Sequence, residues 1–179
     1  MLRRYVERAA YLARTQDLWL VTLTVKNGPD LFERYAHLKH GIKRMRQRAA
    51  KGYGEFSRAS GALWSTEFTN GATGWHPHVH MVWAMPRDQA PIRYGPGSRL
   101  SADWQAITGD SHIVHAERIQ ADDQAALVAA FCEVLKYALK FSTLSLDDNL
   151  HAYFQLKGQR LISSCGSWGG LDLPEEARL

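Results

Sequence analysis

Cysteine is scarce in this sequence, and long apolar runs are missing. Only Cys132 and Cys165 occur among 179 residues, too few for the disulfide framework of a small secreted domain, so we expect both to be reduced structural thiols. The longest uncharged apolar stretch, Leu18–Val25, is far shorter than the roughly 20 residues that span a membrane. Met1–Arg4 leads into a charged segment rather than the apolar core of a signal peptide. These absences predict a cytoplasmic protein.

Repeats and low-complexity tracts are also absent, and the composition is that of an ordinary globular domain. Apolar residues make up 45 % and charged residues 22 % of the chain, which argues against intrinsic disorder. The net charge of +4 is unevenly distributed: residues 1–60 contain 13 basic and 5 acidic residues, and residues 61–179 contain 9 and 13. A basic first third is compatible with a polyanionic partner, and equally with a solvated basic surface.

Hydrophobic periodicity predicts helices interspersed with strands. Residues 31–49 repeat apolar side chains at four- and three-residue spacing, with Asp30 placed to cap the helix. Two apolar runs, residues 62–69 and 76–85, flank an Asn-Gly turn cluster and predict a hairpin. Further helices are predicted over residues 1–15, from Ser101 through Trp104 and over residues 122–142, and further strands over residues 18–26, 112–119 and 160–165. This order favours an α+β fold, in which helices pack on an antiparallel sheet.

Three histidines occupy alternate positions at the start of the predicted strand 76–85. His76, His78 and His80 would project from one face, while the intervening apolar residues face a core. Imidazoles at positions i and i+2 lie side by side, close enough to bind one divalent metal ion. Histidines also line solvated sheet faces without binding metal, but three within five residues favour a metal site.

A third metal ligand is expected on the neighbouring hairpin strand. Paired positions in this hairpin sum to about 145, so Glu67 faces His78 on the polar side of the sheet. A lone surface glutamate is the alternative interpretation, and His76 is an alternative ligand. A cupin would place a glutamate four or five residues after its His-x-His motif, where this chain has Ala84 and Met85. A barrel amidohydrolase would need about 250 residues.

A second polar cluster is predicted on the helix over residues 122–142. Glu133, Tyr137 and Lys140 lie four and three residues apart and therefore share one helix face. Lys136 and Lys140 flank the tyrosine, would favour its phenolate and would hold a phosphate. Tyrosine can act as a covalent nucleophile, although this helix alone favours a tyrosine at the rim of the core. The neighbouring apolar stripe consists of Leu127, Phe131, Val134, Ala138 and Phe141.

Taken together, these patterns resemble the rolling-circle plasmid replication initiators (Rep proteins) of the HUH endonuclease superfamily, in their single-tyrosine class. The named histidines of the HUH motif are matched by His78 and His80. The resemblance covers about residues 18–170 and implies that residues 1–179 form a single HUH endonuclease domain. It rests on four stretches in the family's order: Leu20–Asn27 for the first motif, Trp75–His80 for the HUH motif, Glu133–Tyr137 for the tyrosine motif and Lys157–Ile162 for the C-terminal strand.

The resemblance implies a five-stranded antiparallel sheet of the ferredoxin or RNA-recognition-motif type. It also implies an enzyme that nicks single-stranded origin DNA, often in a hairpin loop, and later rejoins strands. Tyr137 would attack the scissile phosphate, giving a 5′-phosphotyrosine and a free 3′-OH. His78, His80 and Glu67 would hold Mg²⁺ or Mn²⁺, and Glu133 would activate water for the terminating cleavage.

Basic residues complete the predicted site. Lys136 and Lys140 would compensate phosphate charge, and Lys43 and Arg44 of the basic helix would contact DNA phosphates. The implied partners are single-stranded or hairpin origin DNA and the host helicase and polymerase. The chain is short for a complete plasmid initiator, which suggests a catalytic core or a minimal member.

Two other function classes are compatible with parts of the pattern. One is an HUH transposase or relaxase, although the former are usually shorter dimers and the latter are larger, with a different motif order. The other is a non-enzymatic domain that binds single-stranded nucleic acid. Such domains display exposed aromatic side chains on the sheet, whereas this predicted face carries histidines and a glutamate.

Overall fold

The computed structural model describes residues 2–120, 125, 127–129, 131, 132, 134, 144–169 and 175. The strands are β1 (Gln16–Thr24), β2 (Gly61–Gly71), β3 (Gly74–Pro86), β4 (Val114–Arg118) and β5 (Ile162–Gly166). The helices are α1 (Leu2–Leu12), α2 (Leu31–Ala49), α3 (Arg99–Thr108), α5 (Leu146–Leu156) and the short 3₁₀ helix η1 (Glu55–Arg58). The predicted α+β class is confirmed.

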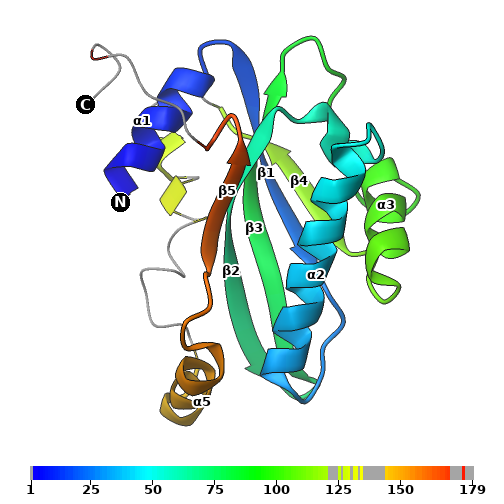
Figure 1. The fold of residues 1–179 in the computed structure, drawn as a ribbon, viewed down its shortest axis with the longest axis vertical. Helices are drawn as coiled ribbons and strands as arrows, with labels where there is room; N and C mark the ends of the chain where they lie inside the picture. The colour runs from blue at the N-terminus through cyan, green and yellow to red at the C-terminus, as the bar shows by residue number, and fades with distance from the viewer. Residues whose placement is uncertain are drawn as a thin grey trace.

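The strands form one five-stranded sheet in the order β4-β1-β3-β2-β5 (Figure 1). Every neighbouring pair is antiparallel, so the five-stranded antiparallel sheet implied by the family resemblance is confirmed. The β2–β3 hairpin is long, and β3 lies in the middle of the sheet between β1 and β2. Side chains on β3 are therefore surrounded by neighbours from both flanking strands.

Helices cover the two faces of the sheet and create two separate cores. On one face, α2 and α3 bury a cluster that includes Leu38 and Trp104. On the other face, a second cluster joins Leu12 of α1 to Phe131 and Val134. Leu127, Phe131 and Val134 belong to the predicted apolar stripe, and all three are buried. The described part of that stripe therefore packs on the sheet as expected.

Helix α2 follows the prediction closely. The carboxylate of Asp30 accepts a hydrogen bond of 2.7 Å from the backbone N–H of Glu33, satisfying a donor that has no partner within the helix. The predicted apolar stripe faces the sheet, except that Ala49 is only half-buried. Its buried members are Leu31, Tyr35, Leu38, Ile42 and Met45.

Some elements differ from the expectation. Helix α3 begins at Arg99 with Ser98 as its N-cap, slightly before the predicted start at Ser101. Helix α5 matches no predicted element, because many of its apolar side chains face solvent and form no core-facing stripe; its exposed apolar residues are Leu146, Leu150, Tyr153 and Phe154. The short helix η1 is likewise unpredicted.

The predicted helix over residues 122–142 is only partly described. All of its described residues, which are 125, 127–129, 131, 132 and 134, are helical. Cys132 is exposed rather than part of the core, and Cys165 is half-buried. Both thiols are free, as expected. No helix within the described ranges is long and apolar enough to cross a membrane.

Candidate metal centre

The β2–β3 hairpin places the predicted metal ligands directly opposite one another. The register pairs Glu67 with His78 and Ser65 with His80, which confirms the predicted sum of 145. Along β3, burial alternates, so that Val79 is fully buried while the histidines on either side are half-buried. The histidines therefore share one face, as the period-two pattern predicts.

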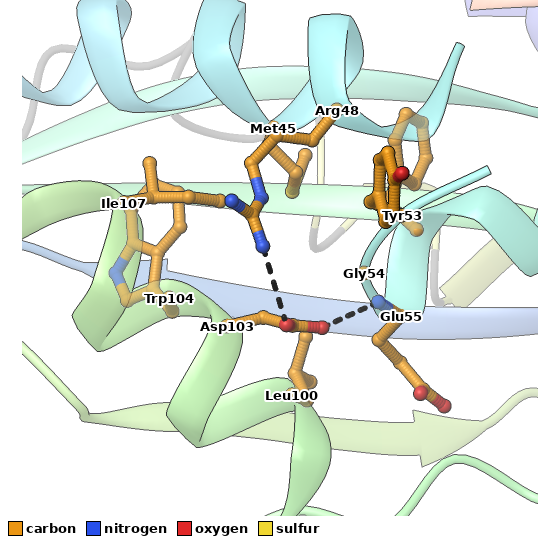
Figure 2. A pocket seen from close by; sticks show the side chains of 10 residues that line it. Met45, Arg48, Tyr53, Gly54, Glu55, Leu100, Asp103, Trp104 and Ile107 are labelled. Atoms are coloured by element: carbon orange, nitrogen blue, oxygen red, sulfur yellow. Dashed lines mark hydrogen bonds and ion pairs between the residues drawn. The ribbon is translucent and has the colours of Figure 1, made fainter. Parts of the chain in front are cut away.

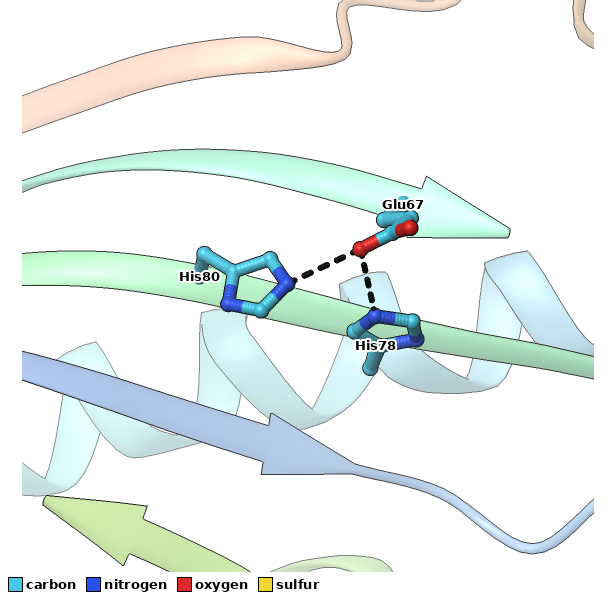
Figure 3. A group of neighbouring side chains, drawn as sticks. All are labelled: Glu67, His78 and His80. Carbon is cyan, nitrogen blue, oxygen red and sulfur yellow. Dashed lines mark hydrogen bonds and ion pairs between the residues drawn. The ribbon is translucent and has the colours of Figure 1, made fainter. Parts of the chain in front are cut away.

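Three of these side chains converge on one point (Figure 3). The Nε2 atom of His78 lies 2.7 Å, and that of His80 3.0 Å, from the same Glu67 carboxylate oxygen, Oε2. Their ligand atoms all lie within 4.8 Å of one another, and no other group of this kind occurs among the described residues. His76 is not part of the group, although its ring centroid is 5.4 Å from that of His78. The geometry therefore favours Glu67 over His76 as the third ligand.

The electrostatics keep the Glu67 carboxylate ionised. Burial alone would raise its pKa, but hydrogen bonds and charge interactions with His78 and His80 lower the pKa to about 2. Burial and the neighbouring His78 lower the pKa of His76, against an opposing effect of Glu67. The cluster thus supplies an anionic oxygen beside imidazole nitrogens, which is the donor set of a divalent metal site.

Backbone and hydroxyl groups orient the two imidazoles from behind. Thr22, which β1 pairs with His80, has its Oγ1 at 3.1 Å from Nδ1 of His80. The Nδ1 of His78 lies 3.4 Å from the carbonyl oxygen of His76. In metal sites, a partner at one ring nitrogen fixes the tautomer and aims the other nitrogen at the ion. Both rings here direct Nε2 towards Glu67, as such a site requires.

The separations also suit metal coordination. Neighbouring ligands in an octahedral shell with bonds of about 2.1 Å lie about 3 Å apart. The two observed distances between Nε2 and Oε2, 2.7 and 3.0 Å, are close to that value. All three ligand atoms also lie within 4.8 Å of one another, so Glu67, His78 and His80 would together be able to hold one divalent ion.

The segment that precedes the predicted nucleophile lies against this same sheet face. The hydroxyl of Ser65, one alternate position before Glu67, donates to the backbone carbonyl of Val134, and both residues are fully buried. Val134 precedes Tyr137 by three residues in the sequence. The predicted residues Glu133, Lys136, Tyr137 and Lys140 themselves lie outside the described residues.

Lys43 and Arg44, the predicted phosphate contacts of α2, lie on the opposite side of the sheet. Both are exposed, and α2 packs on the core face that is remote from the histidines. The structure therefore does not bring them into the metal centre. Their contact with DNA stays a prediction, and it concerns a separate surface.

Two members of the site were missed by the sequence reasoning. Thr22 and Ser65 are ordinary strand residues, and only strand pairing places them beside His80 and the segment that contains Val134. The available signal was the alternation of side chains along a strand. Ser65 lies two residues before Glu67 and so shares its face, and Thr22 lies at an alternating position of β1. The pairing partner of β1, however, could not be read from local pattern.

A family model described as "Replication protein" matches residues 1–171. No curated protein and no solved structure matches the chain. The matched range contains the Glu67, His78 and His80 cluster and all five strands.

Proposed function

Because this chain belongs to the replication protein family of rolling-circle plasmid initiators, within the HUH superfamily, we propose that it nicks single-stranded origin DNA with a tyrosine nucleophile. The general role, that of a rolling-circle replication initiator acting on origin DNA, follows from membership of the family. The observation that carries the proposed nicking mechanism is the convergence of Glu67, His78 and His80 on one point of strands β2 and β3.

The cluster supports a metal-assisted phosphoryl transfer. A divalent ion bound there would act as a Lewis acid on a non-bridging phosphate oxygen and hold the phosphate in place. His78 and His80 would bind it through Nε2 and Glu67 through its carboxylate. Mixed nitrogen and oxygen donors suit a first-row ion such as Mn²⁺ better than Mg²⁺, which prefers oxygen ligands.

Tyr137 is the proposed nucleophile. Its phenolic oxygen would lose its proton to solvent and form a bond to the scissile phosphorus while the bond from phosphorus to the 3′ oxygen breaks. The leaving oxygen takes up a proton to become the 3′-OH, and the phosphate stays on Tyr137 as a 5′-phosphotyrosine. Lys136, next to Tyr137 in sequence, and Lys140, which would share its face of the predicted helix, would offset the charge of the phosphate. The buried contact between Ser65 and Val134 supports this placement, because it fixes the chain three residues before Tyr137 on the metal-binding face.

Glu133 is proposed to complete the cycle. Once Tyr137 is consumed as phosphotyrosine, a second cleavage needs another nucleophile, and a water deprotonated by a nearby carboxylate would serve. Glu133 precedes Tyr137 by four residues and would share its face of the predicted helix. Hydrolytic cleavage would leave no second covalent link and would end the round.

A covalent-trapping assay tests the proposed function. The protein would be incubated with pooled single-stranded oligonucleotides and Mn²⁺, and protein–DNA adducts would be separated on a denaturing gel and their DNA sequenced. We expect adducts with the native chain, and their loss with EDTA, with His78→Ala and with His80→Ala. Adduct formation that survives EDTA or both substitutions would contradict the metal-assisted mechanism. A chain that binds the oligonucleotides without forming any adduct would instead be a non-enzymatic binding domain.

A further inference from the structure

A groove of about 550 Å³ lies on the face of the sheet opposite the metal centre. One wall is α2, and the other is the segment from Arg160 to Ser163 at the start of β5. Trp64 forms part of the floor and belongs to the core under α2, whereas Glu67 and the histidines lie on the other side. The volume is within the range of ligand-binding sites, and the groove is independent of the proposed catalytic cluster.

The groove is strongly basic. None of the residues that line it is acidic, and its four lysine and arginine side chains form no ion pair with any described residue. All four are exposed. Its basic lining residues are Lys39, His40, Lys43, Arg46 and Arg160.

Two other cations of α2 form ion pairs, which distinguishes them from the basic residues of the groove. Arg34 Nη1 lies 3.1 Å from an oxygen of Asp110, and Arg48 Nη2 lies 4.0 Å from an oxygen of Asp103 in α3 (Figure 2). Of the four α2 lysine and arginine side chains without an ion pair to a described residue, three line the groove, and only Arg44 lies outside it. Much of the positive potential of α2 is therefore concentrated along the groove.

Aromatic rings hold two of the cations in position. The Arg46 guanidinium lies over the Trp64 ring at 5.6 Å, and the Lys39 ammonium lies over the Tyr35 ring at 5.8 Å. Lys39 also donates to Gln159 at 3.1 Å. A guanidinium stacked on a ring keeps its N–H edge available for a phosphate. These contacts already restrict the conformations of the Arg46 and Lys39 side chains, so less side-chain entropy is lost when an anion binds.

The same rings are unsuited to stacking with bases. Trp64 is 8 % and Tyr35 3 % exposed, and each has a cation over its ring. Sites for single strands combine charge with open aromatic surfaces, which this groove lacks. Charge without base stacking suits a duplex, whose bases are internal and whose phosphates are external.

We propose that the groove between α2 and β5 binds the phosphate backbone of double-stranded DNA adjoining the single strand that is cleaved on the opposite face. This proposal rests on the proposed function in one respect, which is that the adjoining single strand is the one cleaved at the metal centre. Binding here would be independent of base sequence and would hold the duplex while the scissile segment reaches the metal centre.

The test uses a duplex of about 20 base pairs of arbitrary sequence and a single strand of equal length, with the full chain in EDTA. Binding would be followed by fluorescence anisotropy over a range of salt concentrations. The groove variant is Arg46→Gln with Arg160→Gln. The matched control, Lys51→Gln with Arg93→Gln, also removes two exposed charges that form no ion pair with a described residue, but lies outside the groove.

Each lost phosphate contact should reduce the slope of log affinity against log salt by about 0.9. We expect the groove variant to lower the slope for duplex by about 2, with little change for the single strand, and the control to change neither. Lys39→Gln with Lys43→Gln should repeat the effect if replacing Arg46 disturbs Trp64. An unchanged slope, an equal loss in the control, or a loss confined to the single strand would overturn the proposal.

The experiments distinguish failure of the duplex-binding proposal from failure of the proposed nicking mechanism. The duplex measurement needs neither metal nor Tyr137, whereas covalent trapping on a short single strand needs both. A native chain with the expected slope but no adduct supports the groove and contradicts nicking. A chain that forms adducts while the groove variant keeps its full slope overturns the groove and leaves nicking intact.

Discussion

Thr22 is the side chain that connects β1 to the metal centre. Its hydroxyl lies 3.1 Å from Nδ1 of His80, on the far side of the ring from Glu67. Thr22→Val keeps the shape and removes this partner. We expect metal affinity to fall by about 10- to 100-fold, while the stability of the metal-free protein changes by about 1 kcal/mol. Calorimetric titration with Mn²⁺ measures the first and urea unfolding the second. Unchanged affinity would show that Thr22 has no part in orienting His80.

Tyr137 is tested by removing one oxygen. Tyr137→Phe should abolish the covalent adduct, because the phenolic oxygen is the proposed attacking atom and the ring itself remains. Tyr153→Phe is the matched control, since Tyr153 is an exposed tyrosine of α5. Denaturing gels and mass spectrometry of the trapped peptide provide the measurement. A phosphopeptide that contains a different tyrosine would refute the assignment.

Replacing Glu133 should slow the hydrolytic second cleavage without slowing formation of the Tyr137–DNA adduct. With Glu133→Ala, the Tyr137 adduct should form at its normal rate, while the hydrolysed second product appears more slowly, because no carboxylate activates water. Glu133→Tyr should replace water with a second tyrosine, so that protein-linked product accumulates. Quenched time courses separate the two steps. Equal slowing of both steps in Glu133→Ala would mean that Glu133 supports the metal or the fold instead. An ordinary surface pair with Lys140 would be worth only a few tenths of a kcal/mol.

At the scale of elements, the β2–β3 hairpin decides the geometry of the site. Because side chains alternate between faces, a shift of one residue in pairing would move Glu67 to the α2 side of the sheet. Gly74 fixes the turn: its φ is +90°, and a Cβ there would overlap the carbonyl of Gly28. The Gly28–Trp75 bridge then ties the loop after β1 to the beginning of β3.

Helix α2 depends on its cap. Asp30→Ala removes the acceptor for the Glu33 N–H and should destabilise the protein by about 1 kcal/mol, which lowers the melting temperature by roughly 2–4 °C for a chain of this size. Asp30→Asn keeps a side-chain acceptor and should lie near the native value. Differential scanning calorimetry compares them. If both variants melt together, the capping contact does not contribute to stability.

At the scale of the whole molecule, the sheet separates two surfaces of different chemistry. The face with Glu67, His78 and His80 carries a group that could hold a metal ion, and the α2 face carries unpaired cations. One sheet thus holds the proposed cleavage site on one side and the proposed DNA-binding groove on the other.

Acid stability of the metal-free protein reports on Glu67. Its folded pKa of about 2 lies below the ordinary 4.5, so the carboxylate contributes stability above about pH 4.5 that is lost as the pH falls towards 2. This difference corresponds to roughly 3 kcal/mol. Glu67→Gln should be less stable at neutral pH and should lose less stability between pH 4.5 and 2. Urea unfolding across this range measures both curves. Parallel curves would show that Glu67 is not held ionised by its histidine partners.

The elements that follow a simple period were predictable from local sequence. Alternation along β3, the stripe of α2 and the Asn-Gly turn before Gly74 each express a backbone geometry that needs no tertiary partner. Helix α5 was missed because many of its apolar residues face solvent, so no core-facing stripe reveals it. The pairing of Glu67 with His78 was predicted correctly because one short turn links their strands and fixes the register.

Sequence by itself therefore determined the candidate ligands and their common face, since these depend on residue type and on spacing within one hairpin. Only the tertiary structure placed Thr22 behind His80, Val134 against Ser65, and the basic side of α2 across the sheet from the metal centre. These arrangements depend on which strands become neighbours and which face each helix covers. Long-range packing makes that choice, because each helix must bury its apolar stripe on one of the two faces of the sheet.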